Sequence, residues 1–185
     1  MNLRGVVLAG GLSRRFGRDK ALADAGGGVT FLQRAVGLLR SFDPDPVVIT
    51  CAGRDYRLPG IRFVQSDFIN GKGPLGGLHT AFCLFPGKTL LVLACDMPFV
   101  TRRDLETLVA GHRAGSAATV FPAAGGRAEP FPGVYESRLA ASAERRVSVD
   151  RLSIRGFLEV SSVSIVGAAR RQTLRNINSP ADFVL

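Results

Sequence analysis

Short apolar runs alternate with amphipathic segments over the first two thirds of the chain. The runs are typical of buried strands and lie at residues 4–10, 47–50, 61–65 and 89–94. Thr30 with Gln33 three residues later forms a capping box, which predicts a helix that ends before Pro44. Pro74 suits the first turn of a second helix, and Thr101 suits the N-cap of a third.

This order predicts a doubly wound α/β fold, in which helices cover both faces of a mostly parallel sheet. The remaining residues extend it with strands at 117–121, 133–135 and 160–165. Helices are expected at 136–143 and 147–157, and Ser179–Pro180 marks a short terminal helix. We expect one domain over residues 1–185, because the chain is long enough for one sizeable core and too short for two ordinary ones.

The composition favours a cytoplasmic protein. Hydrophobic residues make up 46% of the chain, yet no apolar run approaches the roughly 18 residues of a membrane span. The first apolar run is followed by Gly-Gly and a basic cluster instead of the cleavage site of a signal peptide. Three cysteines without a C-x-x-C pair indicate neither disulfides nor a cysteine zinc site, and the two histidines lack metal-ligand spacing.

The net charge of +9 indicates an anionic partner. Basic side chains gather in residues 1–20 and 138–175 without interleaved aromatic residues or a nucleic-acid-binding motif. We therefore expect small anions, not nucleic acid, although part of the excess reflects a preference for arginine as the surface cation.

The stretch from Leu8 to Lys20 predicts a phosphate-binding loop. It follows the first strand, begins with adjacent glycines and ends in a basic cluster, a pattern that admits and neutralises a polyphosphate. It is not a Walker loop, because Ala21 follows the lysine instead of Ser or Thr. Nor is it the Gly-x-Gly-x-x-Gly of dinucleotide-binding folds, because Gly10 and Gly11 are adjacent.

Two further features are expected at the same edge of the sheet, where doubly wound folds bind ligands. Residues 73–77 read Gly-Pro-Leu-Gly-Gly and open a helix, whose first amides can bind an anion. Asp96 ends the strongest predicted strand, which suits a magnesium ligand shared with phosphates, although an aspartate before Pro98 also forms turns. Asp67 is either a second polar contact or a solvated loop residue.

The chain resembles the molybdenum cofactor guanylyltransferase family in six motifs along nearly its whole length. These are Leu8-Ala9-Gly10-Gly11-x-Ser13-x-Arg15-x-Gly17-x-Asp19-Lys20-Ala21; Gly73-Pro74-Leu75-Gly76-Gly77; Cys95-Asp96-Met97-Pro98; Glu129-Pro130 with the following Gly133-Val134-Tyr135; Arg145-Arg146-Val147; and Asn176-Ile177-Asn178-Ser179-Pro180. The first motif by itself is common to nucleotidyltransferases, and its combination with the last favours the molybdopterin branch.

The resemblance implies transfer of GMP from GTP to the terminal phosphate of molybdopterin, with release of pyrophosphate. It implies Mg²⁺ as cofactor on Asp96, with Arg15 and Lys20 on the phosphates. Nucleotide contacts are implied for Leu8, Ala9, Gly10, Gly11, Ser13, Lys20, Thr50, Asp67, Gly73, Leu75, Gly77 and Asp96, and acceptor contacts for Arg145, Arg146, Asn176 and Asn178. Residues 1–115 would then bind the nucleotide and residues 116–185 the acceptor, with cofactor biosynthesis and delivery proteins as partners.

Two positions depart from the family pattern, and several functions stay open. Thr50 stands where the family commonly has asparagine, and the loop of Asp67 is one residue shorter before Gly73. Asn176 and Asn178 could instead hydrogen-bond their own loop. The alternatives are the same chemistry with CTP or a sugar phosphate, a non-catalytic adaptor that passes molybdopterin on, and an arginine-driven nucleic-acid binder.

Overall fold

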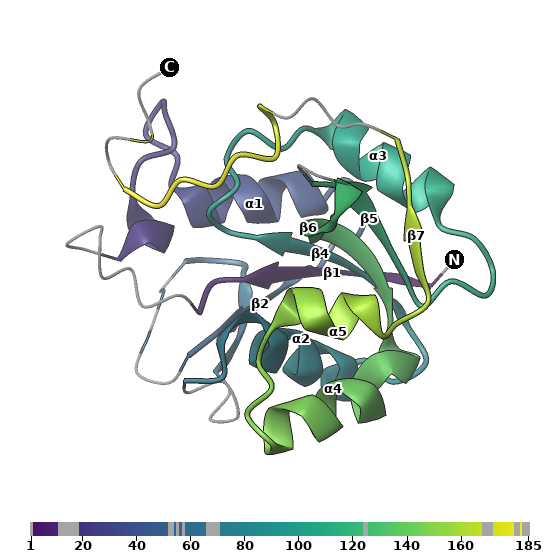
Figure 1. Ribbon diagram of the computed structural model, residues 1–185. Coiled ribbons are helices and arrows are strands. Elements are labelled where there is room, and N and C mark those ends of the chain that lie inside the picture. The colour runs from purple at the N-terminus through teal and green to yellow at the C-terminus, as the bar shows by residue number, and fades with distance from the viewer. Residues whose placement is uncertain are drawn as a thin grey trace.

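A single twisted sheet organises the molecule (Figure 1). The computed structural model describes residues 2–10, 19–51, 54, 56, 58–65, 71–123, 126–167, 172–179 and 182. Within these residues the strands are β1 (Leu3–Leu8), β2 (Val47–Thr50), β3 (Arg62–Gln65), β4 (Thr89–Ala94), β5 (Ala118–Pro122), β6 (Ala128–Glu136) and β7 (Val163–Ile165). Their order is β3-β2-β1-β4-β6-β5-β7, and only β6 runs antiparallel to its neighbours. The predicted mostly parallel α/β sheet is confirmed.

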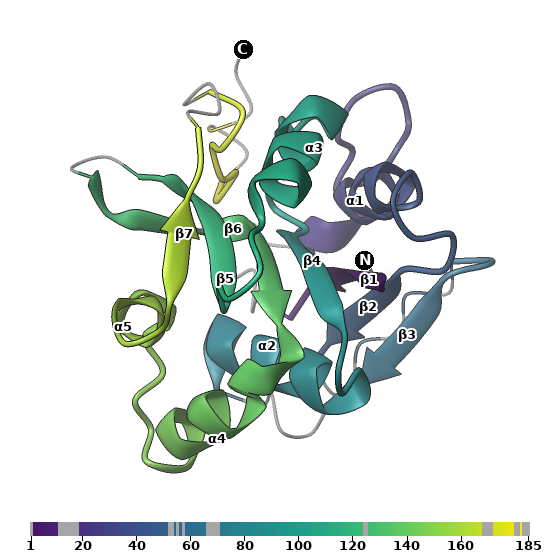
Figure 2. The same cartoon turned by 90° about the vertical axis from the view of Figure 1, so that its right-hand side faces the viewer.

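Helices cover both faces of the sheet (Figure 1). The helices α1 (Phe31–Leu39) and α3 (Arg102–Gly111) lie on one face, and α2 (Gly73–Leu84), α4 (Ala140–Ser148) and α5 (Ile154–Glu159) lie on the other. Two short 3₁₀ turns, η1 (Lys20–Leu22) and η4 (Ser137–Leu139), precede α1 and α4. The view along the sheet in Figure 2 places β3 and β7 at its opposite margins. In the described part of the chain, no helix combines the length and apolar character needed to cross a membrane.

The predicted helix starts follow the capping chemistry of the sequence. Thr30 accepts a hydrogen bond from the Gln33 amide at 3.2 Å, and the Gln33 side chain accepts from the Thr30 amide at 2.9 Å. Thr101 caps α3 in the same way through Asp104. Each box satisfies amides that a helix start leaves without intrahelical partners, which explains why both helices begin at the predicted residue.

The last third of the chain differs from the predicted helices in two places. The helix expected at 147–157 is interrupted, because α4 ends at Ser148 and Ser153 caps a new helix, α5. Asp150 between them has a φ of 55°, which turns the chain out of the helix. The helix expected at 136–143 begins only at residue 137, as a 3₁₀ turn.

Strand β6 is longer than the predicted 133–135. Pro130 and Pro132 obscure it, since proline cannot donate to a strand ladder. Residues 130–132 lie where the β5–β6 register shifts, between the pairs Val120–Gly133 and Phe121–Glu129, so these prolines occupy an irregularity of the pairing. The short terminal helix expected after Ser179 includes residues 180 and 181, which lie outside the described part.

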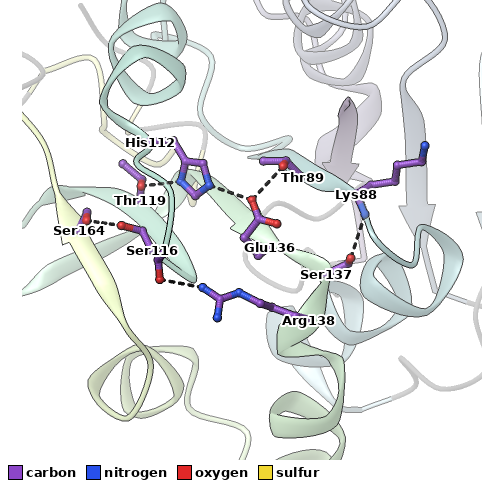
Figure 3. A network of polar contacts seen from close by, with 10 residues as sticks. Lys88, Thr89, His112, Ser116, Thr119, Glu136, Ser137, Arg138 and Ser164 are labelled. Carbon is purple, nitrogen blue, oxygen red and sulfur yellow. Dashed lines mark hydrogen bonds and ion pairs between the residues drawn. The ribbon is translucent and has the colours of Figure 1, made fainter. Parts of the chain in front are cut away.

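A partly buried polar network joins α3 to three strands at the amino end of β4 (Figure 3). His112, the C-cap of α3, contacts the Thr119 hydroxyl through Nδ1 and the Glu136 carboxylate through Nε2, both at 2.8 Å. The same Glu136 oxygen accepts from the Thr89 hydroxyl at 2.8 Å. The network is far along β4 from Asp96, so His112 has a structural place in the fold.

Candidate active site

A pocket of about 220 Å³ opens at the carboxyl ends of the parallel strands. It is bordered by the ends of β1 and β4, the turn η1, the start of α2 and the segment 172–179. The lining residues are Leu8, Ala9, Gly10, Asp19, Lys20, Ala21, Ile49, Gly73, Pro74, Gly77, Ala94, Cys95, Asp96, Phe131 and Asn176. The three sequence features expected to converge on one crevice therefore do so within the described residues.

Lys20 and Asp96 face each other in this pocket. The ammonium Nζ of Lys20 lies 2.9 Å from Oδ2 of Asp96 and donates to the Ile177 carbonyl at 2.8 Å. The two charged side chains are 13% and 22% exposed, so solvent screens their attraction only in part. A cation and a carboxylate 76 positions apart in the sequence thus share one polar centre.

The segment around Ile177 fastens this centre from the C-terminal side. The Ile177 amide donates to the Asp96 backbone carbonyl at 2.9 Å, and the Ile177 carbonyl accepts from the Lys20 ammonium. Ile177 therefore contacts both members of the ion pair. The Ile177 side chain is fully buried against Ala23 and Phe31. The segment is therefore a fixed wall of the pocket, and its carbonyl orients the Lys20 ammonium.

A second network holds the beginning of η1. Asp19 caps this turn by accepting from the Ala21 amide at 3.1 Å, and its other oxygen pairs with Arg54 at 2.5 Å. Arg54 also donates to the Tyr56 hydroxyl at 3.2 Å, and that hydroxyl donates to the Ala9 carbonyl at 3.3 Å. Burial raises the pKa of Tyr56, which keeps its hydroxyl a donor. Arg54 and Tyr56, which follow β2, are thereby connected to Asp19 and Ala9. These two residues lie near the two ends of residues 8–20, the glycine-rich loop.

The start of α2 offers amides to an anion. Gly73 has a φ of 61° and Pro74 follows it, while the N-cap residue Lys72 provides no side-chain hydrogen bond to the first turn. The amino end of this twelve-residue helix carries a partial positive charge. Gly77 brings the helix close to β1, because a Cβ there would lie 3.2 Å from the Leu8 side chain. The small residues therefore let helix and strand meet beside the pocket.

Among the described lining residues, the titratable group besides the lysine and the carboxylates is the Cys95 thiol. Burial raises the pKa of the Cys95 thiol to about 12, so at neutral pH it is uncharged and a poor nucleophile. Among the described residues, no three histidine, cysteine or acidic side chains are grouped as a protein-only metal site would require. Two carboxylates line the pocket among the described residues, and Asp19 is held by Arg54 and the Ala21 amide, which leaves Asp96 as the candidate ligand. This donor set fits Mg²⁺, which binds through one or two carboxylates and substrate phosphates.

Eight of the predicted site residues line the pocket. They are Leu8, Ala9, Gly10, Lys20, Gly73, Gly77, Asp96 and Asn176. The side chains of Thr50 and Leu75 are fully buried, and the Thr50 hydroxyl donates to the Cys51 carbonyl, so neither points to the pocket lining. Asn178 is exposed, and its amide donates to Asp182 at 2.8 Å. These placements do not test binding, and the assigned contacts stay predictions.

Of the remaining predicted residues, two lie on α4 and four lie outside the described part of the chain. Arg145 and Arg146 occupy the last turn of α4. Figure 1 shows α4 on the same face of the sheet as α2, and the two helices pack against each other. The predictions for Gly11, Ser13, Arg15 and Asp67 fall outside the described residues.

Sequence reasoning missed several residues that shape the site. Phe131 lines the pocket from β6, and Arg54 with Tyr56 supports the glycine-rich loop. Arg54 belongs to no motif, so the sequence offered no signal for it. Ile177 did carry a signal, because a single apolar residue between two asparagines indicates an anchored loop.

Comparison with known proteins identifies the family. Residues 5–164 match the MobA-like NTP transferase domain. The probable molybdenum cofactor guanylyltransferase of Pelotomaculum thermopropionicum is 30% identical, with 97% of this chain and 89% of the relative aligned. The protein of the same name from Mycobacterium avium is 33% identical, with 99% and 94% aligned.

Among solved structures, the molybdopterin-guanine dinucleotide biosynthesis protein A of Archaeoglobus fulgidus superposes with a TM-score of 0.75. It is 25% identical, and the match covers 97% of this chain and 94% of that one. These matches agree with the motifs that follow β1 and β4 and with the pocket between them. The chain is therefore a nucleotidyltransferase that belongs to the MobA-like NTP transferase family, as the resemblance to molybdenum cofactor guanylyltransferases indicated.

Proposed function

We propose that this protein transfers GMP from GTP to the terminal phosphate of molybdopterin and releases pyrophosphate. The observation that carries the proposal is the Lys20–Asp96 centre, which lies in the pocket between the end of β1 and the start of α2. The names of the relatives support guanine as the base and molybdopterin as the acceptor.

The chemistry requires charge neutralisation and positioning, not an enzyme nucleophile. An oxygen of the acceptor phosphate attacks the α-phosphorus of GTP, and the bond from that phosphorus to the β-phosphate oxygen breaks. Lys20 would neutralise charge on the triphosphate, and the first amides of α2 would hold a further anionic group. Backbone contacts from Leu8, Ala9 and Gly10 would position the nucleotide along the end of β1.

Asp96 is the residue that would hold Mg²⁺. When bound, the ion would neutralise phosphate charge and help the pyrophosphate depart. The ion pair with Lys20 keeps the Asp96 carboxylate at the pocket. Arg15 would contact the phosphates from the loop beside Lys20, as the family motif implies.

The acceptor would occupy the other side of the pocket. Asn176 lines the pocket, and we assign acceptor contacts to it and to Asn178, Arg145 and Arg146. In this arrangement residues 1–115 bind the nucleotide and residues 116–185 the acceptor. The protein would act in the cytoplasm and pass its product to cofactor delivery proteins.

A nucleotide panel tests the proposal. Pyrophosphate release is measured with GTP, CTP, ATP and UTP, each with Mg²⁺ and with either molybdopterin or a sugar 1-phosphate. We expect turnover with GTP and molybdopterin. Turnover with CTP instead of GTP would show that the transferred nucleotide is CMP. Turnover only with the sugar phosphate would refute molybdopterin as the acceptor. Binding of molybdopterin without pyrophosphate release from any nucleotide would favour the adaptor.

A further inference from the structure

Asp19 places a second carboxylate in the pocket proposed to hold a triphosphate. It lines the pocket directly before Lys20, and its side chain is 25% exposed. The ammonium of Lys20 is paired with Asp96 at 2.9 Å. Like charges repel over several ångströms, so the Asp19 carboxylate would oppose the binding of phosphates unless a further cation neutralised it. A pocket for a polyanion therefore has to account for this charge.

Arg54 supplies the cation beside this carboxylate. Its Nη1 lies 2.5 Å from Oδ2 of Asp19, in a charge-assisted hydrogen bond between residues 35 positions apart. The Arg54 side chain is 18% exposed, and its Nη1 also donates to the Tyr56 hydroxyl at 3.2 Å. Of these two charged residues, both described by the structure, only Asp19 lines the pocket. Arg54 therefore acts on the pocket through Asp19.

The two oxygens of Asp19 have separate partners. Oδ1 accepts from the Ala21 amide at 3.1 Å and caps η1, the turn that begins with Lys20, whereas Oδ2 contacts Arg54. Capping requires only an oxygen acceptor, and asparagine caps about as well as aspartate. The cap and the negative charge of Asp19 can therefore be separated by substitution.

We propose that Arg54 is a positioning residue that cancels the negative charge of Asp19 and thereby makes the pocket compatible with a triphosphate. This inference rests on the proposed function, because the anion is GTP. The charged side chains described around η1 form two pairs whose charges sum to zero, Lys20–Asp96 and Arg54–Asp19. Loss of the arginine would leave a net negative charge beside the phosphates, and loss of both Arg54 and Asp19 charges would restore the balance.

Nucleotide binding tests the inference without the acceptor. Dissociation constants of GTP, GDP and GMP are measured by isothermal titration calorimetry with Mg²⁺ present. Arg54→Gln, which can still hydrogen-bond to its neighbours, should weaken GTP binding about 10- to 100-fold and GMP binding less than about threefold, because repulsion grows with the number of phosphate charges. Arg54→Met should do the same. Equal weakening of all three nucleotides would overturn the inference, because a structural defect spares none of them.

A paired substitution isolates the charge of Asp19. Asp19→Asn keeps an oxygen that can accept from the Ala21 amide and removes the charge. The double variant Asp19→Asn/Arg54→Gln should therefore bind GTP within about threefold of the wild type, even though it carries one substitution more than Arg54→Gln. A double variant that binds GTP as weakly as Arg54→Gln, or more weakly, would overturn the inference.

Two controls separate charge from support of the fold. Arg40→Gln removes the same charge at the end of α1, which leads to the amino end of β2, and should leave all three dissociation constants unchanged. Tyr56→Phe removes the hydroxyl that donates to the Ala9 carbonyl but keeps the arginine, and should weaken GTP binding less than threefold. A loss in either control equal to that of Arg54→Gln would overturn the inference. Thermal unfolding verifies that each variant is folded.

Turnover distinguishes failure of the inference from failure of the proposed function. A wild type that binds GTP but forms no dinucleotide with molybdopterin would overturn the proposed function, while the variant series would still decide the role of Arg54. A wild type that does not bind GTP would overturn both.

Discussion

Replacement of Lys20 by methionine probes the polar centre of the pocket with little change in side-chain volume. The substitution removes the ammonium that lies 2.9 Å from Asp96 and 2.8 Å from the Ile177 carbonyl. If this ammonium neutralises the triphosphate as pyrophosphate leaves, its loss should lower kcat about 10²- to 10³-fold, which corresponds to about 2.7–4 kcal/mol of transition-state stabilisation. The effect on the KM for GTP should be smaller, because binding also uses backbone amides.

The same substitution should have only a modest effect on stability. Asp96 loses the Lys20 partner but stays 22% exposed to water, so we expect a loss of about 1 kcal/mol and not the cost of a fully buried charge. For a protein of this size that lowers Tm by about 2–4 °C. The two magnitudes differ enough to separate a catalytic defect from a folding defect.

The assay is steady-state pyrophosphate release with GTP and molybdopterin, accompanied by a thermal scan. Lys88→Met is the matched control, because this lysine precedes β4 at the end opposite Asp96. The control should retain full activity. A kcat for Lys20→Met within about threefold of the wild type, or an equal loss in both variants, would refute a phosphate role for this ammonium.

Three further substitutions test the metal, the polar network and the packing. Asp96→Asn should lower kcat about 10²-fold or more and raise the Mg²⁺ concentration needed for half the maximal rate, and an unchanged Mg²⁺ titration would exclude this carboxylate as a ligand. His112→Ala should cost about 1–3 kcal/mol in urea unfolding with the kinetic constants retained, because Glu136 and Thr119 each lose a hydrogen-bond partner, and a cost below about 0.5 kcal/mol would contradict that role. Gly133→Ala should destabilise by about 1–3 kcal/mol, because its Cβ would lie 2.7 Å from the Tyr135 ring, whereas Gly37→Ala, with open space around it, should be neutral or stabilising in the same measurement.

The parts of the fold that follow local rules were predictable from the sequence. Apolar runs marked the parallel strands, and the boxes at Thr30 and Thr101 marked the starts of α1 and α3. The break between α4 and α5 was not predictable from apolar spacing, because Val147, Ile154 and Phe157 continue a helical period across it. What ends α4 is the left-handed conformation of Asp150 and the new cap at Ser153.

The parts of the candidate site at the ends of parallel strands were predictable, because the order of the strands fixes which ends lie together. Because β1 and β4 are parallel neighbours, their carboxyl ends meet, and this brings Lys20 to Asp96. The contacts of Arg54 with Asp19 and Tyr56 depend on the path of a loop, and no periodicity encodes that path. The β6 contribution was hidden by its prolines, so the place of Phe131 in the pocket lining became visible only in three dimensions.

The fate of labelled phosphates tests the central claim most directly. In a single turnover with excess enzyme, GTP labelled at the α-phosphate is mixed with molybdopterin and Mg²⁺, and a parallel reaction carries the label at the γ-phosphate. The account predicts that the α-label enters a molybdopterin guanine dinucleotide and that the γ-label appears in pyrophosphate, in equal amounts. Transfer of the γ-label to the acceptor, or no dinucleotide while a sugar 1-phosphate is converted, would contradict it.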